Sequence, residues 1–156
     1  MNNNTIEVLV AYTRPKIWKA VQRRGIANQA ANKKDAKYIA FFLISDKKDE
    51  NGKKIPSVIT HRAEVIETKI VPCGRSYFEK EMPEALELAI EKGWDKEESC
   101  KEYKLGNIIE LNHFIYHRPG KRARFRVCMY TKLSELEKAN FIDEIKTESH
   151  LKKESK

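Results

Sequence analysis

Alternating arginines near the C-terminus are a strong chemical signal in this sequence. Residues 122–130, RARFRVCMY, begin with an arginine at every second position. In an extended strand these side chains share one face, because the side-chain period of a strand is two. Guanidinium groups pair well with phosphate oxygens, so this face suits a phosphate backbone. The arginines concerned are Arg122, Arg124 and Arg126.

The same face has a second interpretation, in which carboxylates on neighbouring strands neutralise the arginines. Glu64 and Glu110 are the candidates for such pairs. Against this, residues 113–132 carry six Lys or Arg and no Asp or Glu of their own. Both interpretations stay open, and in both the opposite face supplies the core candidates Phe125, Val127 and Met129.

A second basic cluster accompanies aromatic residues at the first expected helix. Residues 14–37 carry eight Lys or Arg and one Asp. Such cations hold a nucleic-acid backbone, and an exposed ring stacks on a base. The alternative is that Trp18 packs against a sheet, since one stripe of the helix must be buried. The cluster comprises Lys16, Lys19, Arg23 and Arg24, with Tyr12 and Trp18.

The segment HRAEVI, residues 61–66, divides its side chains between two strand faces. His61 shares a face with Ala63 and Val65, which suits a hydrogen-bonded core histidine. Arg62 points the other way and joins the candidate anion contacts.

An enzymatic alternative rests on Glu64, Glu67 and Lys69. Clustered carboxylates with a lysine are typical of small metal-dependent nucleases. However, Glu64 and Glu67 fall on opposite faces of a regular strand, and no suitable upstream aspartate accompanies them. The sequence also lacks GxGxxG, P-loop, GxSxG and HExxH motifs. We therefore expect no catalytic residues, and keep the nuclease as an alternative.

The cysteines and histidines indicate neither a disulfide framework nor a metal site. Cys73, Cys100 and Cys128 are odd in number and widely spaced. His113 and His117 lie in an expected strand, too far apart to chelate one ion together. We expect free thiols, no metal and no cofactor.

Hydrophobic patterning predicts an α+β fold with a curved, mainly antiparallel sheet or small barrel, flanked by two or three helices. Asn51-Gly52 predicts a hairpin turn, and residues 122–130 are expected to return as a hairpin on the preceding strand. Residues 26–35 read as a loop or second short helix. The expected strands are 6–11, 37–44, 55–71, 103–117 and 122–130. The expected helices are 13–25 and 82–94, and residues 131–145 are expected to form a short helix and an apolar anchor of Phe141, Ile142 and Ile145.

The length of 156 residues predicts one domain, 1–146, followed by a charged, frayed tail at 147–156. No apolar run approaches a membrane span, and the N-terminus does not read as a signal peptide, so we expect a cytoplasmic location and no membrane partner. The net charge of +8 favours a polyanionic partner.

Three segments resemble the PUA-like superfamily, which includes the EVE, ASCH and YTH domains. YIAFFL is followed about twenty residues later by ITHRAEVIE, and RFRVCMYTKLSELEKANFIDEI follows at residues 124–145. The similarity spans most of residues 7–145. It implies a small curved β-barrel with flanking helices that binds DNA or RNA, often through a modified base flipped into an aromatic pocket, without hydrolysis.

This chain departs from related modification-dependent restriction systems because it carries no nuclease or NTPase domain. A protein partner would then supply any enzymatic activity, and a pure protein-interaction adaptor is the other alternative. The candidate polar groups for contacting a base edge are His61, Asn28 and Ser76. The expected base-pocket residues are Tyr12, Trp18, His61, Tyr77 and Trp94. The expected nucleic-acid backbone contacts are Arg14, Lys16, Arg23, Arg24, Arg62, Arg118, Lys121, Arg122, Arg124 and Arg126.

Overall fold

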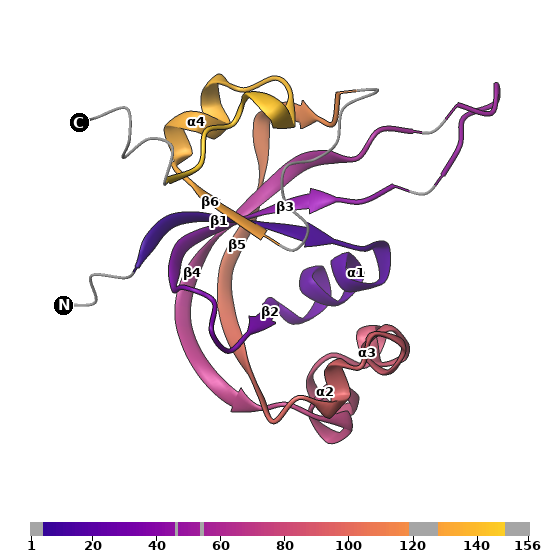
Figure 1. Ribbon diagram of the computed structural model, residues 1–156, viewed down its shortest axis with the longest axis vertical. Coiled ribbons are helices and arrows are strands. Elements are labelled where there is room, and N and C mark those ends of the chain that lie inside the picture. The colour runs from indigo at the N-terminus through magenta and orange to yellow at the C-terminus, as the bar shows by residue number, and fades with distance from the viewer. Residues whose placement is uncertain (1–4, 46, 54, 119–127, 149–156) are drawn as a thin grey trace.

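The computed structural model describes residues 5–45, 47–53, 55–118 and 128–148. Within these residues, six strands form one sheet in the order β2-β5-β4-β3-β1-β6, accompanied by four α-helices. The sheet curls into a half-barrel, with α1 inside the curve, α2 and α3 beyond it, and α4 on the other side (Figure 1). The predicted α+β class with a curved, mainly antiparallel sheet is confirmed.

The described elements are mostly short, apart from two long strands that bend along the half-barrel. The strands are β1 Ile6–Thr13, β2 Ile26–Ala30, β3 Ala36–Leu43, β4 Val58–Pro72, β5 Ser99–Tyr116 and β6 Cys128–Thr131. The α-helices are α1 Pro15–Arg24, α2 Arg75–Glu81, α3 Leu86–Lys92 and α4 Leu133–Lys138. Three 3-10 helices span Pro83–Ala85, Trp94–Lys96 and Ile142–Glu144.

Strand pairing corrects two sequence-based expectations. β6 pairs antiparallel with β1, whereas β5 lies between β2 and β4, so the predicted hairpin between β5 and the next strand is wrong for the described residues. The start of the expected loop or helix at 26–35 is instead the edge strand β2. Four of the pairings are antiparallel, and β1 with β3 is parallel.

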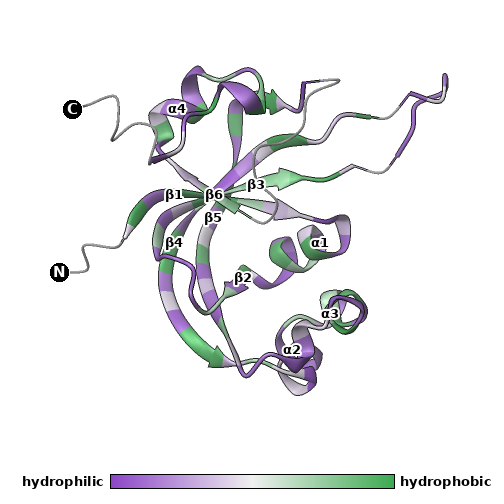
Figure 2. Cartoon of the chain, in the orientation of Figure 1, coloured by the Kyte–Doolittle hydropathy of each residue, from purple (hydrophilic) through white to green (hydrophobic). Residues whose placement is uncertain are grey.

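Adjacent phenylalanines on β3 mark the two faces of the sheet. Phe41 packs with Leu9 and Tyr103 on the α1 side, while Phe42 packs with Val8 and other residues on the α4 side. This division follows from the two-residue period of a strand. Figure 2 accordingly shows β3 as largely hydrophobic, while α1 and α4 alternate between hydrophobic and hydrophilic residues.

The helices between β4 and β5 form a third cluster with α1. Ala20 of α1 is fully buried against Phe78, Met82 and Ala89. The predicted helix at 82–94 begins instead with a 3-10 turn, and α3 starts at Leu86. In α3, Leu88 and Ala89 are buried, whereas Ile90 is 40% exposed.

The loop between β2 and β3 connects β5 with the edge strand β6. The Tyr103 hydroxyl of β5 donates a 2.7 Å hydrogen bond to the Lys34 carbonyl. The Lys34 amide in turn donates to the Tyr130 hydroxyl of β6, and the Lys101 ammonium binds the Asp35 carboxylate at 2.7 Å. These contacts fix the loop on the α1 side of the half-barrel.

Among the described residues, no helix has both the length and the apolar character of a membrane span.

Candidate nucleic-acid interface

The Trp18 ring lies where α1 meets the sheet. Pro15 opens α1 immediately after Arg14, and Gly25 closes it in a left-handed conformation, as the sequence predicts. Val21 is buried against the sheet and Ala20 against the helices between β4 and β5, and Trp18 is half-buried. Its ring centroid is 5.0 Å from that of Phe41 and 5.4 Å from that of His61. Trp18 thus both packs on the sheet and keeps part of its ring accessible.

His61 completes this contact from β4. It pairs directly with Phe41 of β3, so both side chains point to the α1 face. Its Nδ1 lies 2.6 Å from the Thr60 hydroxyl, and this hydrogen bond orients the ring. The half-buried pair of Trp18 and His61, called the Trp18–His61 pair below, offers an aromatic face beside a polar ring.

The exposed side of α1 is only partly neutralised. Lys16 pairs with Glu87 at 3.1 Å, and Arg23 and Arg24 share Glu84 at 3.5 and 3.2 Å. Arg14 and Lys19 are exposed and have no ion pair among the described residues. These two cations flank Trp18 along the chain and remain available to an anion.

Tyr12 lies on the other side of the sheet from the Trp18–His61 pair. It pairs with Phe42 in the parallel β1–β3 ladder, and their ring centroids are 5.2 Å apart. Since Phe42 belongs to the α4 face, so does Tyr12, which is 36% exposed. The structure therefore does not bring Tyr12 together with Trp18 and His61.

Tyr77 on α2 and Trp94 in the 3-10 helix Trp94–Lys96 belong to the insertion between β4 and β5. The Tyr77 hydroxyl donates to Glu102 at 2.7 Å and accepts from the Asn28 amide at 2.8 Å. Burial, followed by the nearby Glu102, raises the pKa of Tyr77 above its ordinary value. Trp94 is 38% exposed. Asn28 is thus engaged with Tyr77, and Ser76 is exposed on α2.

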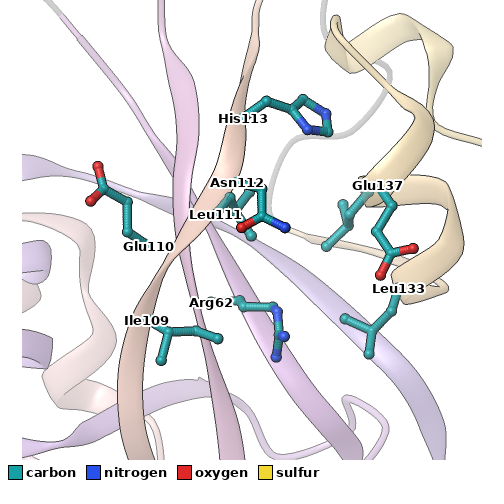
Figure 3. Close-up of a pocket in the computed structure, with 9 residues that line it drawn as sticks. Arg62, Ile109, Glu110, Leu111, Asn112, His113, Leu133 and Glu137 are labelled. Atoms are coloured by element: carbon teal, nitrogen blue, oxygen red, sulfur yellow. The ribbon is translucent and has the colours of Figure 1, made fainter.

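A groove of about 300 Å³ lies on the α4 face, between the β-sheet and α4 (Figure 3). Arg62 enters it from β4, and its guanidinium lies 5.3 Å from the centre of the Tyr38 ring. In Figure 3 Glu110 extends away from Arg62, while Leu133 and Glu137 line the α4 side. The lining residues are Arg62, Ile109, Glu110, Leu111, Asn112, His113, Leu133, Leu136 and Glu137.

This groove has mixed charge, so it suits a small polar molecule better than a phosphate chain. The carboxylate of Glu137, on the α4 side of the groove, opposes the approach of phosphates to Arg62, whereas Glu110 pairs with His61 and points to the α1 face. The groove was not predicted from the sequence. The sequence does show that Ile109, Leu111 and His113 alternate along a strand and that the helix from Leu133 has an apolar stripe. It does not show that this strand and this helix lie next to each other.

Arg118 is held by the C-terminal segment. Its guanidinium lies 3.9 Å from the centre of the Phe141 ring, 3.1 Å from the Asp143 carboxylate and 3.4 Å from that of Glu144. These contacts join the end of β5 to the 3-10 helix at Ile142–Glu144. The other basic residues predicted in this region, Lys121, Arg122, Arg124 and Arg126, lie outside the described residues, as do Phe125 and Val127.

The carboxylates of the nuclease alternative do not converge in the structure. Glu64 and Glu67 are exposed on β4, where register shifts occur between Ala63 and Val65 and between Val65 and Glu67. Lys69 pairs with Glu102 at 3.7 Å. Within the described ranges, no group of three or more His, Cys, Asp or Glu side chains is placed to hold a metal ion.

Comparison with known proteins identifies the fold. No family model matches the chain, and no curated protein matches it. Among solved structures, the chain is similar to the crystal structure of a serine-to-alanine mutant of the ZmASCH protein from Zymomonas mobilis. The TM-score is 0.57 at 10% identity, over 85% of this chain and 93% of that chain. The chain therefore shares the fold of that ASCH protein.

Proposed function

We propose that this chain is a nucleic-acid-binding module without catalytic activity of its own. The observation that carries the proposal is the Trp18–His61 pair, flanked by Arg14 and Lys19. A half-exposed ring supplies a stacking platform for an unpaired base, and the two cations hold adjacent phosphates. Further support comes from the net charge of +8 and from the PUA-like fold.

The finer proposal is that Trp18 stacks on a base taken out of its own stack. Unstacking a base costs a few kcal/mol, so contacts in the protein must offset that cost. The orientation of His61 by Thr60 makes its ring a suitable partner for a base edge. Base-edge contacts specify a sequence or modification, whereas the cations act on any nucleic acid.

Tryptophan fluorescence tests this site directly, because the chain contains two tryptophans. In a Trp94→Phe variant, Trp18 is the remaining tryptophan. We expect single-stranded RNA or DNA to quench its emission with the same midpoint as binding measured by anisotropy of a labelled oligonucleotide. Binding without quenching would place the interface elsewhere, and absence of binding to any DNA or RNA pool would refute the proposed function.

Affinity measurements on matched variants separate stacking from folding effects. We expect Trp18→Ala to weaken binding by roughly 5- to 150-fold, corresponding to about 1–3 kcal/mol for a stacked base. Trp94→Ala should leave affinity unchanged, because Trp94 belongs to the insertion between β4 and β5 and is not part of the proposed stacking site. Circular dichroism of both variants checks that the fold is retained, and Trp18→Phe should restore part of the affinity.

The arginine face predicted at the C-terminal strand has its own test. Replacing Arg122, Arg124 and Arg126 together with alanine should weaken binding to all sequences alike, since phosphate contacts carry no sequence information. Unchanged affinity would assign these arginines a structural role.

A further inference from the structure

Two thiols meet where β4 ends and β5 begins. Cys100 pairs with Val71 in the β4–β5 ladder, and Cys73 lies two residues beyond Val71. Residues two apart on a strand share a face, so Cys73 and Cys100 point to the same side. The Cys73 amide continues the ladder by donating to the Glu98 carbonyl at 3.1 Å. Cys73 is close enough to contribute, after burial, to the raised pKa of Cys100.

The surroundings of the two thiols differ. Cys100 is buried, 7% exposed, and the Asn28 amide approaches its sulfur at 3.8 Å. Cys73 is only half-buried, and its thiol donates to the Trp94 carbonyl at 3.2 Å. Cys128 lies on β6, at the opposite edge of the sheet order from β2 and β5. The three cysteines therefore divide into one neighbouring pair and one remote thiol.

We propose that Cys73 and Cys100 form an oxidation site that closes into an intramolecular disulfide when the protein meets a hydroperoxide. The Cys73 thiolate attacks the peroxide oxygen, which oxidises it to a sulfenic acid and releases hydroxide or, with an organic peroxide, an alkoxide that takes up a proton. The Cys100 sulfur then attacks the Cys73 sulfur. The S–S bond forms, the S–OH bond breaks, and the Cys100 proton leaves with the hydroxyl as water.

The order of these steps follows from exposure. Cys73 is the more accessible sulfur, so the peroxide reaches it first. Burial, and then the neighbouring Cys73, raise the pKa of Cys100 to about 12, so Cys100 stays protonated until it resolves the sulfenic acid. The resolving step should therefore become faster as the pH rises from 7 to 9.

Bond formation also moves the start of α2. Diagonal neighbours in an antiparallel pair have Cα atoms about 7–8 Å apart. A disulfide usually spans about 4.4–6.8 Å between Cα atoms, so Cys73 must move toward Cys100. Cys73 follows Pro72, the last residue of β4, and α2 begins at Arg75. The adjustment thus falls at a strand end, and oxidation draws the helix–strand junction toward the sheet.

Thiol counting and peptide mapping test the site on the full chain. After treatment with hydrogen peroxide and alkylation, we expect free thiols to fall from three to one. The mapped peptides should join Cys73 to Cys100 and leave Cys128 alkylated, and dithiothreitol should restore all three thiols. Cys128→Ser should form the same bond, while Cys73→Ser should retain two free thiols without an intramolecular bond.

Four outcomes would overturn the proposal. These are three alkylated thiols after peroxide treatment, a bond that includes Cys128, disulfide-linked dimers on a non-reducing gel, and irreversible over-oxidation of Cys73 while Cys100 stays reduced. Circular dichroism of each variant before oxidation checks that the thiols are compared in folded protein.

Discussion

Glu135 is a buried carboxylate that joins α4 to the C-terminal segment. It is 3% exposed and accepts a 3.0 Å hydrogen bond from the Lys146 amide. The Lys138 ammonium lies 2.8 Å from its other oxygen. Burial alone would raise the pKa of Glu135, but these two donors outweigh it and hold the pKa below the ordinary value. Glu135 is therefore favoured as an anion in the folded state.

This pKa shift predicts a loss of stability in acid. A carboxyl group with a lowered folded-state pKa stabilises the protein above its unfolded pKa of 4.5, and loses that contribution as the pH falls through the lower folded value. Glu135→Gln should cost about 1–2 kcal/mol at pH 7, because it weakens charge-assisted hydrogen bonds. Urea unfolding from pH 7 to 3 should show a flatter profile for this variant than for the parent chain.

Glu137→Gln is the matched control, since it removes the same charge from the exposed side of the same helix. Its stability profile should follow that of the parent. Equal slopes below pH 4.5 for the parent and Glu135→Gln would contradict the role assigned to Glu135.

The position of a side chain was predicted well where it depends on the period of one strand. It was predicted poorly where it depends on how two elements pack together. The two-residue period put His61 with Ala63 and opposite Arg62, and the structure agrees. The separation of Tyr12 from Trp18 depends on the parallel pairing of β1 with β3, which neither local sequence encodes. Likewise, Glu84 and Glu87 reach α1 through packing that the charge pattern did not indicate.

At the scale of elements, the end of α1 depends on one backbone conformation. Gly25 has φ of 66°, and its amide donates to the Val21 carbonyl. Its own carbonyl accepts from the Leu105 amide at 2.8 Å, which ties the helix end to β5. A side chain is disfavoured in this left-handed region. We expect Gly25→Ala to destabilise the protein by about 1 kcal/mol, and Gly25→Asn by less.

Gly106→Ala serves as the comparison in the same urea titration. Gly106 has no left-handed conformation, and an added methyl group would meet Ile66 at an ordinary 3.5 Å. This substitution should be neutral or stabilising, because it restricts the unfolded chain. If Gly106→Ala lowers the free energy of unfolding as much as Gly25→Ala does, the left-handed conformation of Gly25 is not the cause of the destabilisation.

Element types were easier to predict than element partners. Apolar runs and turn residues located five of the six described strands, and the helix expected at 13–25 corresponds to α1. β2 was missed because the segment IANQA lacks a clear alternation of apolar and polar residues and contains few β-branched residues. β6 was assigned to the wrong neighbouring strand because its pairing with β1 joins distant parts of the chain. The periodicity of hydrophobic residues does not indicate which strands pair over such distances.

At the scale of the whole molecule, charge is only partly segregated. The cations of α1 approach the acidic helices of the β4–β5 insertion, and three of them form ion pairs there. Such exposed pairs contribute little stability, so a phosphate can replace the carboxylate partner at small cost. Arg14 and Lys19 need no such exchange. The interface proposed around Trp18 should therefore respond to salt more strongly than net charge alone implies.

Salt dependence tests this last point quantitatively. Each phosphate contact contributes a slope of about −0.7 to −0.9 in a plot of log affinity against log salt concentration. Replacing Arg14 and Lys19 with alanine should reduce the magnitude of the slope by roughly 1.4 to 1.8. Replacing Lys92 and Lys96, two exposed lysines near the end of α3, changes the net charge equally and should leave the slope unchanged. Equal changes of slope in the two double variants would mean that binding depends only on the net charge, and they would contradict an interface at Trp18.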